Sequence, residues 1–465
     1  MSHIVEISKL TEYAVQDQVL SHFEDNNLFH SNHHGFLPSR STATALLQIY
    51  DIFLSNAEEK KITGAIFLDL SAAFDIVDHS ILLKKLASYN FSNSTLCFFK
   101  SYLSERKQRV QVQSKVSNEL DVGCQGVPQG SILGPLLFLI FVNDFPAHSE
   151  QGESVMYADD DTEVVSSKDP DILQEKLQNK ADSASIWINE NKMLCSGEKT
   201  KLLIISTKEL RRSKLEGKIF RIRVGNELVE ETKSEKLLGI NLNNDLTWST
   251  HLYGNNRNDI GLLSKLSKRA GILARLNMFM KSNQFSSVCD GLFTSGLLYC
   301  LPLFGNVWDL PTMDDTSRRS KAFSTEDCRR LQVIQNKVLR CKTKNFDYRT
   351  PTRELLKQTG DLSVHQLIAY HSLLTLARIF FNRKPDYLVT RFGLKKPNSE
   401  HVAPSRQLNS IQVYAKLSIS RSGFSYRSAK LWNGLPEHLR KLTCMKKFKI
   451  EVKDWVKRFV PVKPE

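Results

Sequence analysis

Two apolar segments in the first half of the chain carry acidic residues where a strand would end or turn. Residues 64–70 read Gly-Ala-Ile-Phe-Leu-Asp-Leu, so Asp69 is the single acid in a strand-like run. Residues 155–165 read Val-Met-Tyr-Ala, then three consecutive aspartates, then Thr-Glu-Val-Val. Apolar flanks around a short polar centre predict a β-hairpin whose turn holds Asp159 and Asp160.

The two segments together predict one acidic site. A carboxylate inside a buried strand is costly unless it is paired, hydrogen-bonded or bound to metal. If the two strands lie side by side, Asp69 and Asp159 meet, and the repulsion between clustered carboxylates is relieved by a hard cation such as Mg²⁺. An isolated run of aspartates would more simply be a solvated turn. The acid in the other strand instead favours a site for two-metal phosphoryl transfer.

Other segments have clear periodicity. Residues 6–29 and residues 80–104 have apolar positions at helical spacing. Residues 108–116 alternate like a strand. The chain is therefore expected to mix helices and strands.

A loop over residues 33–42 follows the first helix. Gly35 and Pro38 interrupt regular structure there, and Ser41 or Thr42 can cap the helix that follows. Arg40, at the start of that helix, is the kind of residue that meets a phosphate, although a lone arginine is more often a solvated surface residue.

A second loop, residues 126–135, reads Gly-Val-Pro-Gln-Gly-Ser-Ile-Leu-Gly-Pro and precedes a strongly apolar helix. Its glycines allow close backbone approach, Ser131 can cap the helix, and the loop amides can face a nucleotide. A purely structural turn would not require Gln129 between the proline and Gly130. Small residues directly after Asp69 leave room for a substrate that Phe74 can border, although a core phenylalanine explains this position equally well.

The composition and the distribution of charge indicate which class of partner the chain binds. The 465 residues are 41% hydrophobic and 25% charged, which predicts a folded chain of two or three domains. The net charge is +14, but residues 1–170 hold 12 Lys and Arg against 22 Asp and Glu, whereas residues 171–465 hold 52 against 28. An acidic half followed by a basic half favours a polyanionic partner, although a merely soluble basic surface has the same charge.

The cysteines and the hydropathy pattern predict the compartment. The eight cysteines are scattered without a C-x-x-C pair, which argues against a zinc site and a disulfide framework. The chain begins without a secretory signal, and its longest apolar run is far shorter than a membrane span. We expect a soluble intracellular protein of the nucleus or cytoplasm, with no membrane partner.

Three motifs in this order carry a family resemblance. They are Phe-Leu-Asp ending at Asp69 with Phe74 beyond it, Gly-Val-Pro-Gln-Gly-Ser at 126–131 and Tyr-Ala-Asp-Asp at 157–160. Together these motifs closely resemble the reverse transcriptases of non-LTR (LINE-type) retrotransposons, notably the jockey and CR1-like groups. The resemblance implies that the catalytic metal ligands are Asp69, Asp159 and Asp160. It also implies that Phe74 excludes the ribose 2′-hydroxyl, that Gln129 and Gly130 lie near the template and the incoming nucleotide, and that Arg40 belongs to a fingers motif.

One residue departs from the family pattern. Asp161 follows the acidic pair, where the family more often has threonine or another small residue. We expect metal binding to survive this difference.

The resemblance continues towards the C-terminus. Residues 187–201 resemble the next palm segment, in which Lys199 would assist pyrophosphate departure unless it is a plain surface lysine. Residues 237–251, with Gly239, resemble the hairpin that grips the primer end. Residues 260–310 resemble thumb helices, whose basic residues would follow the nucleic-acid backbone or form a solvated face: Lys265, Lys268 and Arg269.

The implied fold is α+β, a right-hand polymerase with an antiparallel palm sheet backed by helices. Residues 1–60 are expected to form partial fingers, 61–245 the palm with inserted fingers helices, 246–325 thumb-like helices, and 326–465 a basic helical C-terminal region. Family members carry an endonuclease domain and a first fingers segment upstream, and neither is recognisable here. We therefore expect incomplete fingers and an endonuclease portion as a partner.

The implied reaction is template-directed DNA synthesis, usually on RNA. A primer 3′-hydroxyl would attack a dNTP with two Mg²⁺ ions, for which Mn²⁺ can substitute. The expected partners are an RNA template, a DNA primer or target, and dNTPs. A catalytically inactive, truncated remnant that only binds nucleic acid is the alternative. A telomerase-like or maturase-like polymerase fits the acids equally well but fits residues 432–436, Trp-Asn-Gly-Leu-Pro, poorly.

Overall fold

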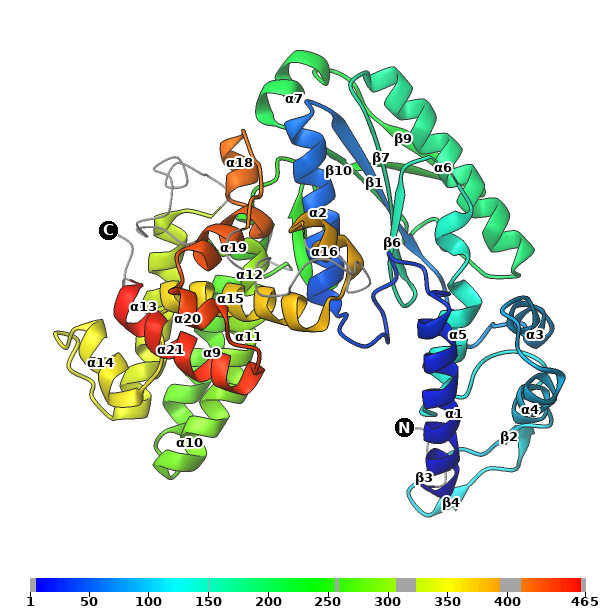
Figure 1. Cartoon of the computed structure of the whole chain (residues 1–465), viewed down its shortest axis with the longest axis horizontal. Coiled ribbons are helices and arrows are strands. Elements are labelled where there is room, and N and C mark those ends of the chain that lie inside the picture. Colours follow the sequence, from blue (N-terminus) through cyan, green and yellow to red (C-terminus); the bar gives the residue numbers. More distant parts are fainter. Residues whose placement is uncertain (1–5, 150, 256–258, 307–322, 394–410, 461–465) are drawn as a thin grey trace. The chain divides into compact units, whose positions relative to one another are not determined.

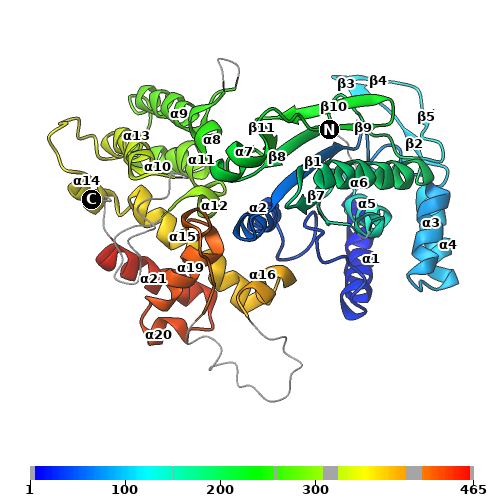
Figure 2. The same ribbon diagram turned by 90° about the horizontal axis from the view of Figure 1, so that it is seen from above.

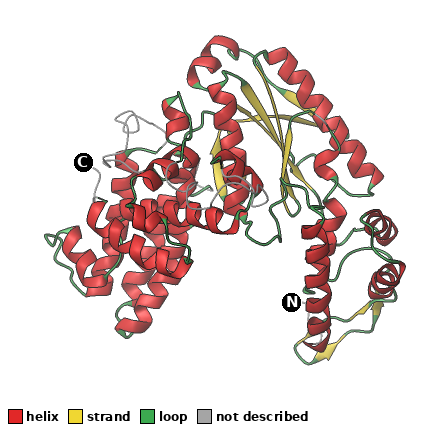
Figure 3. Cartoon of the chain, viewed as in Figure 1, coloured by secondary structure: helices red, strands yellow, loops and turns green. Residues whose placement is uncertain are grey.

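The computed structural model describes residues 6–149, 151–255, 259–306, 323–393 and 411–460. The chain folds into two compact units. The first comprises residues 1–45, 62–204 and 215–232, and the second comprises residues 46–61, 205–214 and 233–465. Helices and strands occur in both units (Figure 3), which confirms the α+β class. The division into fingers, palm, thumb and C-terminal region stays a prediction.

A six-stranded sheet forms the centre of the first unit (Figure 1), in the order β6-β7-β1-β8-β10-β9. Strand β7 pairs antiparallel with both β6 and β1, β9 pairs antiparallel with β10, and β8 pairs parallel with β10. The sheet is therefore mostly antiparallel, as predicted. Its strands are β1 (Ile62–Asp69), β6 (Glu153–Tyr157), β7 (Asp160–Ser167), β8 (Lys201–Ile205), β9 (Arg221–Val224) and β10 (Glu227–Thr232).

Helix α6 (Pro170–Glu190) covers one face of this sheet (Figure 1). The helix begins where the side chain of Asp169 accepts hydrogen bonds from the first backbone amides. Its buried stripe includes Leu173, Leu177, Ala181 and Ala184. Gly64 in β1 permits this packing, because a Cβ at that position would lie 2.7 Å from a methyl carbon of Leu177.

Four further helices of this unit pack against one another (Figure 2): α1 (Glu6–Asp25), α3 (His79–Ser88), α4 (Asn93–Leu103) and α5 (Leu133–Val142). Every residue of α5 except Pro135 is buried, and α1 and α3 pack against it. Glu12 of α1 accepts a hydrogen bond from the backbone amide of Ile132 at 2.6 Å, directly before α5. The helix expected over residues 6–29 thus exists but ends at Asp25.

The single strand predicted over residues 108–116 is wrong. The region holds four two-residue strands, paired β2–β5 and β3–β4. Gln113, with φ of 56°, lies in the turn that reverses the chain between β3 and β4. Val110 and Val112 are both more than half exposed, so the alternation does not mark a buried face. The strands are β2 (Lys107–Gln108), β3 (Gln111–Val112), β4 (Lys115–Val116) and β5 (Leu120–Asp121).

The second unit is mostly helical, as predicted for residues 260–306, whereas residues 256–258 and 307–322 of the expected thumb lie outside the described residues. A two-stranded hairpin stands beside the helices. The elements are α2 (Thr42–Glu58), α7 (Lys208–Lys214), β11 (Ser234–Leu237), β12 (Ile240–Asn243), α8 (Ser249–Tyr253), α9 (Leu262–Leu276), α10 (Ser282–Cys289), the π-helical turn η2 (Asp290–Thr294), α11 (Ser295–Leu298), α12 (Leu301–Phe304), α13 (Thr325–Thr343), α14 (Thr352–Thr359), α15 (Val364–Asn382), α16 (Asp386–Arg391), α18 (Ser418–Arg421), α19 (Phe424–Asn433), α20 (Glu437–Arg440) and α21 (Met445–Phe459).

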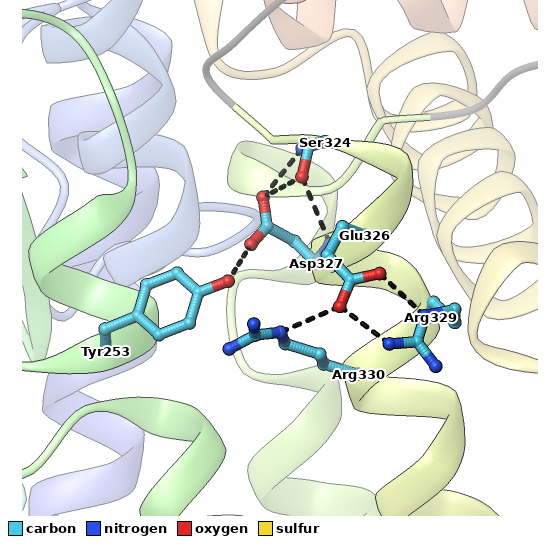
Figure 4. A network of polar contacts seen from close by, with 6 residues as sticks. All are labelled: Tyr253, Ser324, Glu326, Asp327, Arg329 and Arg330. Carbon is cyan, nitrogen blue, oxygen red and sulfur yellow. Dashed lines mark hydrogen bonds and ion pairs between the residues drawn. The ribbon is translucent and has the colours of Figure 1, made fainter.

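The start of α13 is fixed by a polar network (Figure 4). Ser324 and Asp327 form a capping box, and Tyr253 of α8 donates a hydrogen bond to Asp327 at 2.5 Å. Glu326 accepts hydrogen bonds from Arg329 at 2.6 Å and Arg330 at 3.0 Å. Because these ion pairs are exposed, the capping box and the tyrosine contribute more to the attachment of α13 than the arginines do.

A buried polar cluster joins α2 to the C-terminal helices of the same unit. Arg427 of α19 is fully buried, and its guanidinium donates to the backbone carbonyls of Pro302 at 2.8 Å and Leu303 at 3.3 Å. Ser425, also of α19, donates to the Asp51 carboxylate of α2 at 2.6 Å. Helix α2 is therefore held by residues that are far away in sequence.

One helical stretch of the described residues, Ser282–Phe304, is long and apolar enough to cross a membrane by composition alone. Its side chains Phe285, Phe293, Leu297 and Leu301 are buried, and the stretch packs against α9 and α13. A buried stripe on one side is typical of an amphipathic helix packed against a folded domain, and the stretch is weak evidence for a membrane span.

The buried carboxyl of Asp51 gives a pH-dependent stability prediction. Burial raises the pKa of Asp51 from 3.8 to about 6. Because the unfolded chain releases this proton more readily, the free energy of unfolding falls as pH rises from about 4 to about 6. In Asp51→Asn the carboxamide oxygen can still accept a hydrogen bond from Ser425, but the side chain no longer titrates. We predict that this variant lacks the decrease in the free energy of unfolding that Asp51 causes between those pH values. Urea unfolding of the second unit across that pH window measures it.

The matched control is Asp454→Asn, because Asp454 is exposed on α21. The control is expected to keep the wild-type dependence on pH. An Asp51→Asn chain whose stability falls with pH as steeply as that of the wild type would contradict the prediction.

Candidate active site

The predicted carboxylates meet at one end of β1 and β7. The pairing register sets Asp69, the last residue of β1, directly opposite Asp160, the first residue of β7. Tyr157 pairs with Asp160 across the β6–β7 hairpin, so the turn consists of Ala158 and Asp159. The predicted hairpin is confirmed, but Asp160 lies in the strand rather than in the turn. Asp160, not Asp159, is the cross-strand partner of Asp69.

Negative charge at this site is incompletely compensated. Partial burial, followed by the charges of Asp159 and Asp69, raises the pKa of the Asp160 carboxyl. The Oδ2 atom of Asp69 is buried and receives no hydrogen bond within the described structure, although the Lys199 ammonium forms an ion pair with it at 3.1 Å. A divalent cation would supply the missing positive charge, so the residues present fit a metal site.

The carboxylates are not arranged as a complete set of ligands for a metal ion. Among the residues that the structure describes, no group of three or more His, Cys, Asp or Glu side chains is already arranged to hold a metal ion. Metal binding by Asp69, Asp159 and Asp160 therefore stays a prediction.

Backbone pairing brings Lys199 to Asp69. The amide of Ser71 donates to the carbonyl of Leu194 at 2.8 Å, and the amide of Ser196 donates to the carbonyl of Asp69 at 3.1 Å. The Lys199 side chain is 65% exposed, so its ion pair is weak and the ammonium is able to move.

Asp161 lies on the other face of the sheet, because successive strand residues alternate. It is buried there with Glu163 and Lys180. The Lys180 ammonium lies 2.9 Å from Glu163 Oε2, to which Ser154 also donates at 2.7 Å. Burial, followed by the charge of Glu163, raises the pKa of Asp161 well above its ordinary value. Asp161 is therefore not a fourth carboxylate at the acidic site.

The loop after Val122 is attached to the residues that follow Asp69. Gln129 donates from its carboxamide nitrogen to the Asp75 carboxylate at 2.7 Å, and the amide of Val127 donates to the carbonyl of Phe74 at 2.9 Å. The attachment holds Gln129 and its neighbour Gly130 near the acidic site, where both are exposed.

The end of this loop starts α5. Gly130 has φ of 85°, a conformation that favours glycine. The Ser131 hydroxyl accepts a hydrogen bond from the amide of Gly134 in the first turn of α5 at 2.8 Å, although the residue directly before the helix is Ile132 rather than Ser131.

Phe74 lies between two other rings. It stacks on Phe138 with centroids 4.2 Å apart, and it makes a T-shaped contact with Phe36 at 6.1 Å. Phe138 is fully buried, whereas Phe36 is half exposed. Phe36 belongs to the Gly-Phe part of the same fingers motif as Arg40, but the motif predicts no role for its ring.

Arg40 is occupied by its own loop. Its guanidinium donates to the backbone carbonyls of Ser31 at 2.7 Å and His30 at 3.4 Å, and also to that of His33. Ser41, one of the two predicted caps, accepts from the amide of Thr44 at 3.3 Å. A contact of Arg40 with a phosphate stays a prediction.

The remaining predicted residues belong to the second unit. Gly239, with φ of 81°, lies in the β11–β12 turn, where Tyr299 donates to the carbonyl of Leu238 at 2.5 Å. Lys265 and Lys268 are exposed on α9. Arg269 instead donates to the carbonyl of Leu292 at 3.1 Å, so part of its guanidinium holds the helices together. Contact of these four residues with nucleic acid stays a prediction.

Comparison with known proteins agrees with the motifs. Residues 2–242, slightly more than half of the chain, match the family model described as reverse transcriptase (RNA-dependent DNA polymerase). The RNA-directed DNA polymerase from mobile element jockey of Drosophila melanogaster is 26% identical over 309 residues, which are 64% of this chain and 32% of that protein. The probable RNA-directed DNA polymerase from transposon BS of the same species is 23% identical over 85% of this chain and 42% of that protein.

A third relative, the probable RNA-directed DNA polymerase from transposon X-element, is 26% identical over 74% of this chain and 35% of that protein. The chain thus spans well under half the length of these curated relatives. The solved structure of telomerase from Candida tropicalis with a fragment of telomeric RNA is 12% identical, with a TM-score of 0.38 over 76% of this chain and 56% of that chain. A likeness at that level adds nothing to the assignment.

The buried cluster behind the acidic site gives a stability prediction. Lys180 and Glu163 are both 1% exposed, so removing the ammonium leaves the buried carboxylate without its lysine counter-charge. We predict that Lys180→Met lowers the free energy of unfolding of the first unit by about 3–5 kcal/mol. Denaturant unfolding followed by circular dichroism measures the loss.

Two further variants make this test specific. Lys176→Met on the same helix removes a lysine that is only partly buried, and it is expected to have a much smaller effect. Adding Glu163→Gln to Lys180→Met removes the unpaired charge and is expected to restore part of the stability. A Lys180→Met chain as stable as Lys176→Met would show that the cluster is not needed.

Proposed function

Because this chain belongs to the reverse transcriptase family, we propose that it is an RNA-directed DNA polymerase of a non-LTR retrotransposon. The observation that supports this best is the register that sets Asp69 opposite Asp160, with Asp159 in the adjoining turn. In this proposal the three carboxylates hold two Mg²⁺ ions, or Mn²⁺ in their place. The partners are an RNA template, a DNA primer or target, dNTPs and an endonuclease portion of the element.

The proposed reaction is nucleotidyl transfer. The primer 3′-hydroxyl attacks the α-phosphate of a dNTP, a phosphodiester bond forms, and pyrophosphate leaves. When bound, the metal ions lower the pKa of the hydroxyl and neutralise the leaving group. Lys199 is released from its weak ion pair with Asp69 and neutralises charge on the departing pyrophosphate.

Residues of the surrounding loops position the nucleotide. Phe74 borders the ribose and opposes a 2′-hydroxyl. Gln129 and Gly130 border the base pair from the loop that Asp75 holds in place. Arg40 keeps the loop before α2 in one conformation through its hydrogen bonds to backbone carbonyls and, in this proposal, contacts a phosphate.

The location inside the cell is part of the proposal. All eight cysteines are free thiols, which suits a reducing compartment such as the nucleus or the cytoplasm.

Loss of one carboxylate tests the chemistry. We predict that Asp159→Ala lowers primer extension on an RNA template, with Mg²⁺ and dNTPs, by at least about a hundredfold while the chain stays folded. The matched control is Asp161→Asn, because Asp161 lies on the opposite face of the sheet, and its neutral isostere is expected to extend the primer normally.

Two outcomes would contradict the proposal. Wild-type rates in Asp159→Ala would show that the acidic site is not catalytic. A folded wild-type chain that binds RNA tightly and extends no primer would support the alternative, a remnant that only binds nucleic acid.

Charge on α9 gives a prediction about binding. We expect Lys265→Gln with Lys268→Gln to weaken binding of an RNA–DNA hybrid and to reduce the slope of log affinity against log salt by about two, because two phosphate contacts are lost. Fluorescence anisotropy across a salt series measures both quantities. The control pair, Arg353→Gln with Lys357→Gln, removes two exposed cations from α14. An unchanged salt slope in the α9 variant would rule out its contact with the backbone.

A further inference from the structure

Phe36 is held beside the acidic hairpin by the backbone of the residues that precede it. The amide of His34 donates to the carbonyl of Met156 at 2.8 Å, and the amide of Met156 donates to the carbonyl of Asn32 at 3.0 Å. Gly35 lies so close to the turn that a Cβ there would be 2.4 Å from the nitrogen of Ala158. The residue after Gly35 therefore has a fixed place next to Asp159.

The backbone at Phe36 is in a strained conformation. Four non-glycine residues in the loops around the carboxylates have left-handed backbone angles: Phe36 (φ 53°), Ser39 (φ 63°), Ala72 (φ 49°) and Ala158 (φ 58°). This conformation is unfavourable for a residue with a large side chain. Burial of the ring does not compensate, because Phe36 is 50% exposed. Strain retained at an exposed ring points to a function for that ring.

Phe36, Phe74 and Phe138 form a row of three aromatic rings in contact. At one end, Phe138 is fully buried in α5 and stacks on Phe74 at an interplanar angle of 25°. At the other end, Phe36 meets Phe74 at 90°. The ring of Phe74 is thus held between a core residue and a residue carried by the loop on the catalytic hairpin.

We propose that Phe36 is a positioning residue for Phe74, and that discrimination between deoxyribonucleotides and ribonucleotides depends on both rings. This inference rests on the proposed polymerase function. A ring excludes a 2′-hydroxyl only if it cannot tilt away from the sugar. Phe138 blocks one direction of tilt, and Phe36 blocks another. When Phe36 is shortened, Phe74 tilts into the vacated space and a ribose is admitted.

The test is the ratio of kcat/KM for a dNTP to kcat/KM for the matching rNTP, measured by single-nucleotide primer extension on an RNA template. We expect Phe36→Leu to lower this ratio at least about tenfold, mainly through better use of the rNTP, and to change dNTP use less than about threefold. Phe74→Val is expected to lower the ratio further. The double variant should be no worse than Phe74→Val, because both substitutions act through the same ring.

Two control variants distinguish the effect of losing the Phe36 ring from a general effect on folding. Phe36→Tyr keeps the ring and is expected to keep the wild-type ratio. Phe98→Leu shortens a partly exposed phenylalanine of α4 in the same unit, 38% exposed, and is expected to leave the ratio unchanged.

The outcomes distinguish this inference from the proposed function. A wild-type chain that uses neither nucleotide contradicts the polymerase function and the inference with it. A selective wild type together with a Phe36→Leu variant of equal selectivity overturns the inference alone. An equal loss of dNTP and rNTP use in Phe36→Leu shows a merely structural role and also overturns it.

Discussion

The pairing of β1 with β7 determines which carboxylates of these two strands lie at the site. Directly opposite residues of an antiparallel pair share a face, so Asp69 and Asp160 lie on the same side of the sheet. A slip of one residue would exchange the faces and place Asp161 at the site. In the observed register, Asp161 instead lies with Glu163 and Lys180 beneath α6. The sheet therefore separates an under-compensated acidic site from a buried cluster that contains its own cation.

The loops around the site are attached to these same strands or to the residues that follow them. Residues 32–34 bond to β6, residues 126–127 bond to the segment after Asp69, and residues 194–196 bond on either side of the end of β1. Each attachment runs through backbone groups, which leaves the side chains of Phe36, Gln129 and Lys199 exposed beside the carboxylates. The site is thus assembled from distant segments without depending on the second unit for any of these bonds.

Part of this arrangement could be predicted from the sequence. Apolar runs interrupted by acids located β1 and the hairpin, and the order of three motifs indicated the family that the comparisons confirm. The register could not be predicted, because it depends on pairing between segments far apart, and the turn was misplaced by one residue. The strand expected over 108–116 failed because apolar alternation there reflects no buried face. The bonds of Arg40 go to backbone carbonyls, and the partners of Phe36 lie far along the chain, so no local pattern reveals them.

The central claim is that Asp69, Asp159 and Asp160 act together as one metal site. The most direct measurement is the binding of Mn²⁺, followed by electron paramagnetic resonance, to the chain with primer–template and dNTP. We expect Asp69→Asn to weaken this binding by at least about tenfold, and Asp161→Asn, on the opposite face, to leave it unchanged. Equal Mn²⁺ affinity in the wild type and in Asp69→Asn would contradict the claim.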